Sequence, residues 1–154
     1  MLGRSLALIS VAFAALAWNS EPLHLVGLAS SVKGSGTINF GASVEHVTVN
    51  TSGSSGRATF NDRTASGNVN GSIDVNCVRI VGNEATISGI VSHSNRKSIE
   101  GFEALFQIRD NGGRKAQTDM MSPVLFHAVG TGSNCQVPGE FDLAPVKGDF
   151  TVQP

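Results

Sequence analysis

Four histidines are the side chains of this chain best suited to bind a transition metal or to act as a general base. They stand at His24, His46, His93 and His127, and no H-E-x-x-H or H-x-H pattern joins any two of them. Distant strands can be neighbours in a sheet, so a metal site built from His46, His93 and His127 is one hypothesis. The wide spacing favours structural or surface histidines instead. We therefore predict no metal site and no cofactor.

A group of oxygen ligands follows in Asp110-Asn-Gly-Gly113, with Asp119 a few residues later. The group lacks the D-x-[DN]-x-[DN]-G spacing and the distal bidentate glutamate of a calcium loop. Asp and Asn side chains also cap turns by accepting hydrogen bonds from the backbone two residues on. We predict a turn here and not a calcium site.

Serines are frequent, but none lies in a G-x-S-x-G nucleophile elbow. Gly53-Ser-Ser-Gly56 is one residue short of that motif and lies between predicted strands. The acidic residues are spread singly, without the carboxylate pair that a glycosidase requires. We predict no catalytic residue. Because a Ser–His–Asp triad is recognised by geometry and not by order, a hydrolase stays open as an alternative.

The chain has two cysteines, Cys77 and Cys135, which are not in a C-x-x-C arrangement. In an exported protein two such cysteines are most simply one disulfide. Closing a loop of about 59 residues would stabilise the fold by roughly 4 kcal/mol in the chain-entropy model. We predict this bridge.

The N-terminus has the pattern of a secretory signal peptide. Arg4 precedes the apolar run Ser5 to Ala17, which ends in the small-x-small site Ala15-Leu-Ala17. The run is shorter than the roughly 20 residues of a membrane span, so an uncleaved anchor is the weaker alternative. A second cut after Ala29 is also open. We predict a signal peptide over 1–17, a flexible segment over 18–35, an all-β domain over 36–154, and a secreted or envelope-associated protein.

Composition narrows the function classes. The net charge is -1 and only 15% of residues are charged. Such a balance predicts neither nucleic-acid binding nor a polybasic lipid-binding patch. The single Trp and the absence of Tyr argue against an aromatic platform for carbohydrate. The 18 glycines suit short strands joined by tight turns.

Alternating apolar residues predict about eight strands from residue 36 onward, without an amphipathic helix between them. Parallel pairing requires crossover connections, so the sheet should be antiparallel. Consecutive short hairpins favour a curled meander or β-barrel, and a β-sandwich is the alternative.

The hairpin around Gly82-Asn83 is the strongest local prediction. The apolar alternation changes parity near Cys77, which predicts a β-bulge there. The predicted cross-strand pairs are Ile80 with Ala85, Val78 with Ile87, Cys77 with Gly89, Val75 with Val91, and Ile73 with His93.

Six alternating phenylalanines admit two interpretations. They could line a cavity for an apolar ligand, as in a lipocalin-like barrel, or fill the core, which suits a domain of this size. In the strand 102–109, Leu105 lies on the other parity from Phe102 and Phe106, with the polar residues that should face outward. The six phenylalanines are Phe40, Phe60, Phe102, Phe106, Phe126 and Phe150. The predicted core consists of Phe60, Ile73, Val75, Ile87, Phe102, Phe106 and Phe126.

The segment from Val69 to Pro154 resembles a group of small secreted bacterial β proteins of uncharacterised role, which includes domains of the post-COAP type. The resemblance implies an exported β fold and implies no chemistry. It rests on Val75-Asn-Cys77, Val81-Gly-Asn-Glu-Ala-Thr-Ile-Ser-Gly89, Phe106-Gln-Ile-Arg-Asp-Asn-Gly112 with Asp119, Cys135, and Val146-Lys-Gly-Asp-Phe-Thr-Val152.

These observations predict a secreted, non-enzymatic β domain that binds a partner or has a structural role. A small barrel that binds an apolar ligand is the first alternative, and a hydrolase with an unrecognised site is the second.

Overall fold

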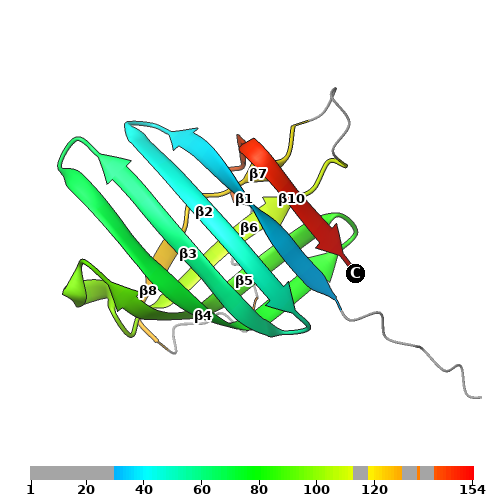
Figure 1. The fold of residues 1–154 in the computed structure, drawn as a ribbon, viewed down its shortest axis with the longest axis horizontal. Helices are drawn as coiled ribbons and strands as arrows, with labels where there is room; N and C mark the ends of the chain where they lie inside the picture. The colour runs from blue at the N-terminus through cyan, green and yellow to red at the C-terminus, as the bar shows by residue number, and fades with distance from the viewer. Residues whose placement is uncertain (1–29, 113–117, 130–134, 136–140) are drawn as a thin grey trace, which may run out of the picture.

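The computed structural model describes residues 30–112, 118–129, 135 and 141–154. In this part of the chain, ten strands form one antiparallel sheet that curls into a nearly closed barrel (Figure 1). The predicted all-β class and barrel are therefore confirmed. The strands are β1 (Ser31–Phe40), β2 (Ser43–Ser52), β3 (Ser55–Thr64), β4 (Gly67–Val81), β5 (Glu84–Ser94), β6 (Glu103–Arg109), β7 (Met120–Met121), β8 (Leu125–His127), β9 (Ala144–Pro145) and β10 (Lys147–Gln153).

The predicted signal peptide, residues 1–17, lies outside the described residues, as do residues 18–29. The predicted domain start at residue 36 falls inside β1, whose pairing with β10 begins at Ser31.

No helix in the described ranges is long and apolar enough to cross a membrane.

The first five strands form a meander whose hairpins each turn within two residues. Thr64 pairs with Gly67, and Val81 pairs with Glu84 across the predicted turn at Gly82-Asn83. Gly82 begins this predicted turn, and Gly41 and Gly53 begin two of the other three, each with positive φ, which a residue without Cβ adopts at no steric cost. Two-residue turns fix the register, so the outward side chains of neighbouring strands form straight rows across the barrel.

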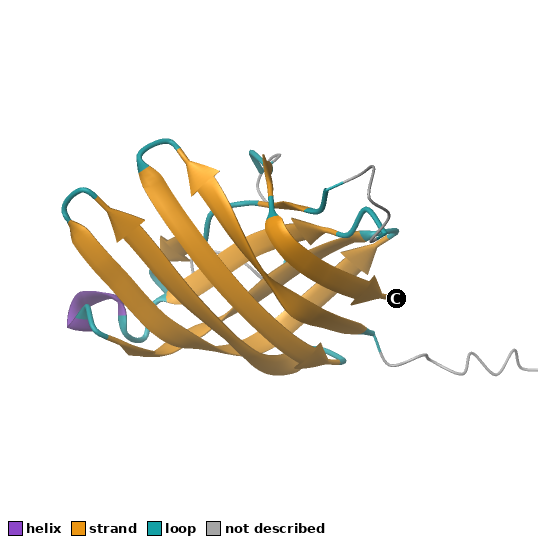
Figure 2. Ribbon diagram, turned by 45° about the horizontal axis from the view of Figure 1, so that its top comes forward, coloured by secondary structure: helices purple, strands orange, loops and turns teal. Residues whose placement is uncertain are grey.

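Two carboxylates help to close the barrel where the backbone ladder ends. At this seam β10 pairs with β1 on one side, and on its other side it faces the end of β6 (Figure 2). Asp119 Oδ2 accepts a hydrogen bond from Phe150 N at 2.7 Å, and Asp110 Oδ2 accepts one from Val152 N at 2.9 Å. These bonds satisfy β10 N–H groups that would otherwise have no strand partner.

Side chains fill the barrel interior. Phe106 and Phe150 are fully buried, and Ile38, Ile73 and Ile87 lie with them in one continuous core. Most of the predicted core residues are buried: Phe60, Ile73, Val75, Ile87 and Phe106. Phe126 is half-buried and packs on Phe60 with ring centroids 5.1 Å apart.

Phe102 was predicted in the core, and this is wrong. Its side chain is 38% exposed. The residue precedes β6 and follows a single turn of 3-10 helix, Lys97–Ile99. Its N–H is bonded to Ile99 O, and its carbonyl accepts from Val91 N. It is therefore held in a turn before the strand begins, and the alternation of β6 does not extend to it.

The predicted bulge near Cys77 is confirmed: the extra residue is Asn76, which precedes Cys77 on β4. Val78 pairs with Ile87 and Ile80 with Ala85, as predicted. The predicted pairs below them are wrong, because the extra residue is Asn76 in β4 and not a residue of β5. An extra residue in either strand restores the inward parity, so the apolar pattern cannot tell the two apart. The observed pairs are Cys77 with Ser88, Val75 with Gly89, Ile73 with Val91, and Ser72 with His93.

A second register shift, which the sequence did not predict, leaves Ser92 of β5 unpaired between Val91 and His93. After this shift the strands pair with the same offset as they have near the Gly82 turn, and His93 lies directly opposite Ser72. Bulges bend the strand that carries them and are frequent beside functional sites.

The outer face of the barrel differs between two regions. We call the outer face of β2 and β3 the open wall. Buried and exposed residues alternate along most of β2, and from Arg57 to Phe60 in β3. On the outer face of β5 and β6, which we call the covered wall, Thr86, Ser88 and Leu105 are also buried. Cys135, bonded to Cys77, lies against Ser88 on this wall.

Candidate functional site

Two rows of polar side chains cross the outside of the barrel. The register aligns outward residues of successive strands, because hairpin partners face the same side of a sheet. The first row is Thr37, His46, Asn61 and Asn70, on β1 to β4. The second row is Ser35, Thr48, Thr59, Ser72 and His93, on β1 to β5.

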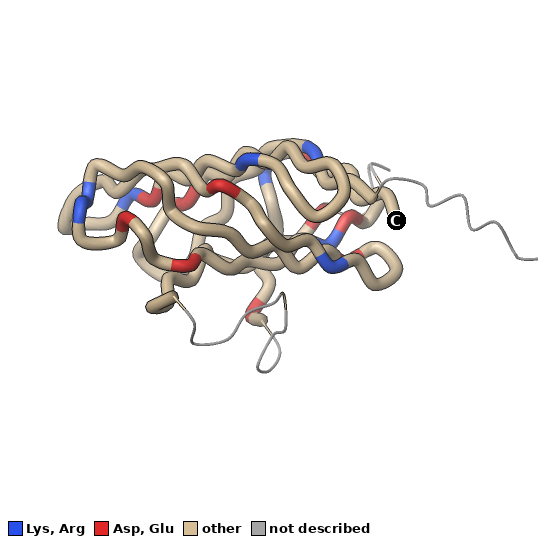
Figure 3. The backbone as a smooth tube through the Cα atoms, turned by 90° about the horizontal axis from the view of Figure 1, so that it is seen from below, with Lys and Arg blue, Asp and Glu red and all other residues tan. Residues whose placement is uncertain are grey.

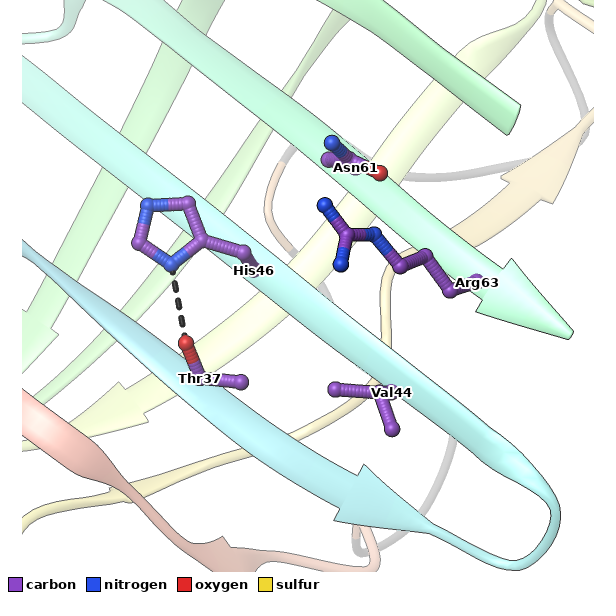
Figure 4. Close-up of a pocket in the computed structure, with 5 residues that line it drawn as sticks. All are labelled: Thr37, Val44, His46, Asn61 and Arg63. Atoms are coloured by element: carbon purple, nitrogen blue, oxygen red, sulfur yellow. Dashed lines mark hydrogen bonds between the residues drawn. The ribbon is translucent and has the colours of Figure 1, made fainter. Parts of the chain in front are cut away.

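Two adjoining hollows lie along these rows, and they share His46 and Asn61. Together they form what we call the outer groove. The first hollow, of about 250 Å³, is lined by Thr37, Val44, His46, Asn61 and Arg63 (Figure 4). The second, of about 350 Å³, is lined by His46, Thr59, Phe60, Asn61, Asn70, Gly71, Ser72 and His93.

Gly71 explains part of the second hollow. It is the inward partner of Phe60, whose ring passes close beside it. A Cβ on Gly71 would lie 2.8 Å from two Phe60 ring atoms, which is closer than real Cβ contacts. The glycine lets the inward Phe60 ring lie close against the wall beneath this hollow.

His46 is held by its neighbours at the centre of the groove. Its Nδ1 is 2.9 Å from Thr37 Oγ1, and its Nε2 is 3.5 Å from Thr48 Oγ1. The first contact joins two residues of the same row on adjacent strands. Hydroxyls on both sides of the ring orient His46 while they keep its face exposed to the groove.

Arg63 supplies a guanidinium without a partner. It makes no hydrogen bond or ion pair with any residue that the structure describes. In Figure 4 its guanidinium extends between Asn61 and Val44. Arg57, on the same strand and the same face, is instead paired with Asp74 at 3.3 Å.

Asn61 carries a buried oxygen that nothing satisfies. Its Oδ1 is the one buried side-chain nitrogen or oxygen among the described residues without a hydrogen-bond partner. Buried polar atoms in folded proteins are almost always bonded, and an exception requires an explanation such as a bound group. Asn61 lines both hollows, so a turn of its amide group toward either one would bring this oxygen to a donor there.

Ser72, His93 and Glu100 have the residue types of a hydrolase triad, but they do not form one. His93 Nδ1 is 3.4 Å from Glu100 Oε1, which also accepts from Lys97 Nζ at 2.7 Å. Hydrogen bonds from Lys97 and from the backbone of Ser94 lower the pKa of Glu100. Although Ser72 faces His93 across the ladder, no hydrogen bond joins its hydroxyl to that ring in the described structure. The base therefore does not activate the nucleophile in this arrangement.

The structure does not bring together all three histidines of the hypothetical metal site, which required His46, His93 and His127. The structure brings His46 and His93 into one hollow, whereas His127 lies on β8, which pairs with β6. Within the described ranges no three His, Cys, Asp or Glu side chains are placed to hold a metal ion.

Asp110 and Asp119 act as turn and seam residues. Asp110 Oδ1 accepts from Gly112 N at 2.7 Å, which is the predicted Asx turn. Asp119 Oδ1 accepts from Asn111 N at 2.9 Å. With the bonds to β10, every oxygen of the two carboxylates accepts a backbone N–H.

The sequence interpretation missed a buried carboxyl group at Glu45. This residue is 5% exposed inside the barrel, and both its oxygens accept from Val124 N, the shorter contact being 3.1 Å. Burial raises the pKa of Glu45 to about 7; the bond from Val124 opposes this shift and the charge of Asp62 adds to it. The available clue was parity, since Glu45 shares the inward face of Val47 and Val49.

The predicted disulfide is confirmed. Cys77 and Cys135 are bonded, and their Cα atoms are 5.9 Å apart. Cys77 lies on β4, which also carries Asn70 and Ser72 of the outer groove, and the bridge contacts Ser88 of β5 on the covered wall. A disulfide fits a protein of a non-cytoplasmic compartment.

No family model, no curated protein and no solved structure matches this chain. The resemblance to secreted bacterial β proteins therefore stays a prediction, and function must be argued from the geometry of the groove.

Proposed function

We propose that this chain is a secreted, non-enzymatic binding domain that holds a hydroxyl-rich polymer, such as a polysaccharide, in the outer groove. The observation that carries the proposal is the pair of polar rows that cross neighbouring strands in register.

The side chains of the rows suit hydroxyl groups. Thr, Ser and Asn each offer both a donor and an acceptor, and a neutral His ring does the same. A sugar hydroxyl also donates and accepts, so it can bond to any member of a row. Strands β1 to β4, which carry most of the rows, are each paired on both sides, which leaves no free backbone there for a peptide to extend as a strand.

The extent of the rows suits an extended ligand. Neighbouring strands lie about 4.8 Å apart, so the row over five strands spans roughly 19 Å. The two hollows are shallow parts of one groove and share His46 and Asn61. A chain of several sugar units would contact the full length, whereas a single small molecule would contact only part of it.

The alternatives have less support. An apolar ligand would require space inside the barrel, where Phe106 and Phe150 are fully buried among the core side chains. A hydrolase would require the Ser72 hydroxyl bonded to His93. Neither the filled interior nor the open Ser72–His93 pair favours these functions.

Two features support secretion. The sequence of residues 1–17 has the pattern of a signal peptide. Cys77 and Cys135 form a bond that cytosolic reductants would oppose. A binding domain of this kind would meet polysaccharides outside the cytoplasm.

The test is a binding panel of neutral and acidic polysaccharides, measured by affinity electrophoresis and calorimetry. Thr59→Trp places a large ring in the second hollow, and we expect it to weaken binding at least tenfold. Asn50→Trp is the matched control, because Asn50 is exposed on the same wall outside both hollows. We expect it to bind like the parent protein.

Both substitutions are on exposed strand positions, so we expect stability changes within about 0.5 kcal/mol. If no polysaccharide binds, or if Thr59→Trp and Asn50→Trp bind equally well, the outer groove is not a polysaccharide site.

A further inference from the structure

We propose that the polymer is acidic, and that one of its carboxylates pairs with Arg63 while an adjacent hydroxyl donates to Asn61 Oδ1. This inference rests on the proposed function and adds the charge of the ligand and its placement in the first hollow.

First, Arg63 has a guanidinium that is unpaired among the described residues and can bind an anion. Its guanidinium lies at the first hollow without any partner in the described structure. An arginine presents a planar fork of donors that matches both oxygens of a carboxylate. A single unpaired arginine suits one carboxylate at a time, whereas phosphate- and sulfate-rich polymers usually require clusters of basic residues.

The second step is the unsatisfied oxygen of Asn61. This Oδ1 is buried and has no donor, although Arg63 lies two residues away on the same face of β3. A hydroxyl beside the bound carboxylate would supply the missing donor. The two groups thus require a ligand that carries an anionic acceptor and a neutral donor close together, as a uronic acid residue does.

The third step is the charge of the groove. Among the described residues that line the two hollows, none is Asp or Glu, whereas Arg63, His46 and His93 are basic. Glu45 and Asp62, which pair across β2 and β3, point away from this face: Glu45 is buried inside the barrel and Asp62 accepts from Ser43. Along the described residues Lys and Arg are interspersed with Asp and Glu (Figure 3), so the preference for an anion is local to the groove.

The experiment compares polygalacturonate with its fully methyl-esterified form, which has the same backbone without the charge. We expect the acid form to bind at least tenfold more tightly at about 0.1 M salt, and the difference to shrink in 1 M salt because screening weakens an exposed pair. Arg63→Gln should weaken binding of the acid form by roughly 10- to 100-fold, the effect of a lost charge-assisted bond. It should change binding of the ester by less than about threefold.

Arg57→Gln is the matched protein control. Arg57 is on the same strand and face and is paired with Asp74, outside both hollows. It removes the same charge, and we expect it to leave binding within twofold. Asn61→Asp is a second variant: its carboxylate would occupy Arg63, so it should also weaken binding of the acid form.

Several outcomes separate this inference from the proposed function. Equal binding of acid and ester, with loss only in Thr59→Trp, overturns the carboxylate and leaves the polysaccharide groove intact. Equal losses in Arg57→Gln and Arg63→Gln overturn it as well, since the attraction would then come from the whole surface. Heparin that binds more tightly than polygalacturonate, and that depends on Arg63, replaces the carboxylate with a sulfate. If neither polymer binds and the neutral panel also fails, the proposed function itself is wrong.

Discussion

The open wall and the covered wall are parts of the same barrel, but their outward side chains meet different surroundings. On the open wall the outward residues are exposed polar side chains, and β2 alternates between buried and exposed positions over most of its length. On the covered wall the outward row consists of Cys77, Ser88 and Leu105, and the last two are buried along with Ala85 and Ile87 on the inner face. Both walls share one core.

This comparison of the two walls shows that different faces of one sheet can have different roles, stability on the covered wall and, as proposed, binding on the open wall. The disulfide places Cys135, which is fully buried, over the outside of β4 and β5. On the covered wall the outward Ser88, which Cys135 contacts, is therefore buried like the inner face. No residue in the described part of the chain covers the open wall in this way, so its outward residues are available for binding.

The largest effect that would test this contrast is loss of the disulfide. The double variant Cys77→Ser, Cys135→Ser should lower the free energy of unfolding by about 4 kcal/mol, as expected for a loop of 58 residues. Hydrogen exchange should increase first in β5 and β6. A loss below about 1 kcal/mol, or faster exchange first in β2 and β3, would show that the cover does not depend on the bridge.

Truncation of outward side chains should distinguish the walls directly. Leu105→Ala should cost about 3 kcal/mol, because Leu105 is 3% exposed although it points outward. Thr59→Ala, at an outward and exposed position of the open wall, should change stability by no more than about 0.5 kcal/mol. Urea denaturation of both variants gives the comparison, and equal costs would remove the distinction between the walls.

Leu105 also marks the limit of the sequence-based prediction. The alternation of apolar residues predicted that Leu105 faces solvent on β6, because Ala104, Phe106 and Ile108 have the inward parity. On β2 and β3 the same argument was right, because water covers the outer face there. On β6 it failed, because the outward Leu105 is buried like its inward neighbours, and alternation alone does not report what covers an outer face.

The site was less predictable than the fold. Turn chemistry predicted the hairpin at Gly82, which is a local feature. The disulfide partners were predicted because the chain has only two cysteines. The groove depends on cross-strand rows, and a row exists only when several registers are known together. His46 and His93 are 47 positions apart in sequence, and the register shift at Ser92 that aligns His93 with Ser72 has no signature in the apolar pattern.

Glu45 connects the two walls through the interior, and its effect should depend on pH. It lies on β2, and it accepts from Val124, just before β8, which pairs with β6. The folded protein holds the pKa of Glu45 at about 7, above the usual 4.5, so the folded state binds this proton more tightly than the unfolded state. Its contribution to stability is therefore present below about pH 4.5 and is lost as the pH rises to about 7.

A shift of this size corresponds to about 3 kcal/mol. Glu45→Gln keeps an oxygen for Val124 N and cannot ionise. We expect it to be more stable than the parent protein at pH 8, by up to that amount, and to match it at pH 4.5. Thermal unfolding over this pH range measures the difference. An equal pH dependence in the two proteins would show that Glu45 does not titrate in this window.

The smallest effect should come from the centre of the open wall. Asn61 Oδ1 is buried without a partner, which costs the folded protein part of the desolvation energy of an amide oxygen. Asn61→Leu has nearly the same shape and removes that oxygen, so we expect stability to be unchanged or to increase by up to about 1 kcal/mol. Asn70→Leu, at the exposed register partner, should change stability by less than about 0.5 kcal/mol. A groove-lining residue that destabilises the free fold is best explained by binding. If Asn61→Leu instead loses more than about 1 kcal/mol in calorimetry, the oxygen already has a partner in the free protein, and the binding argument for Asn61 fails.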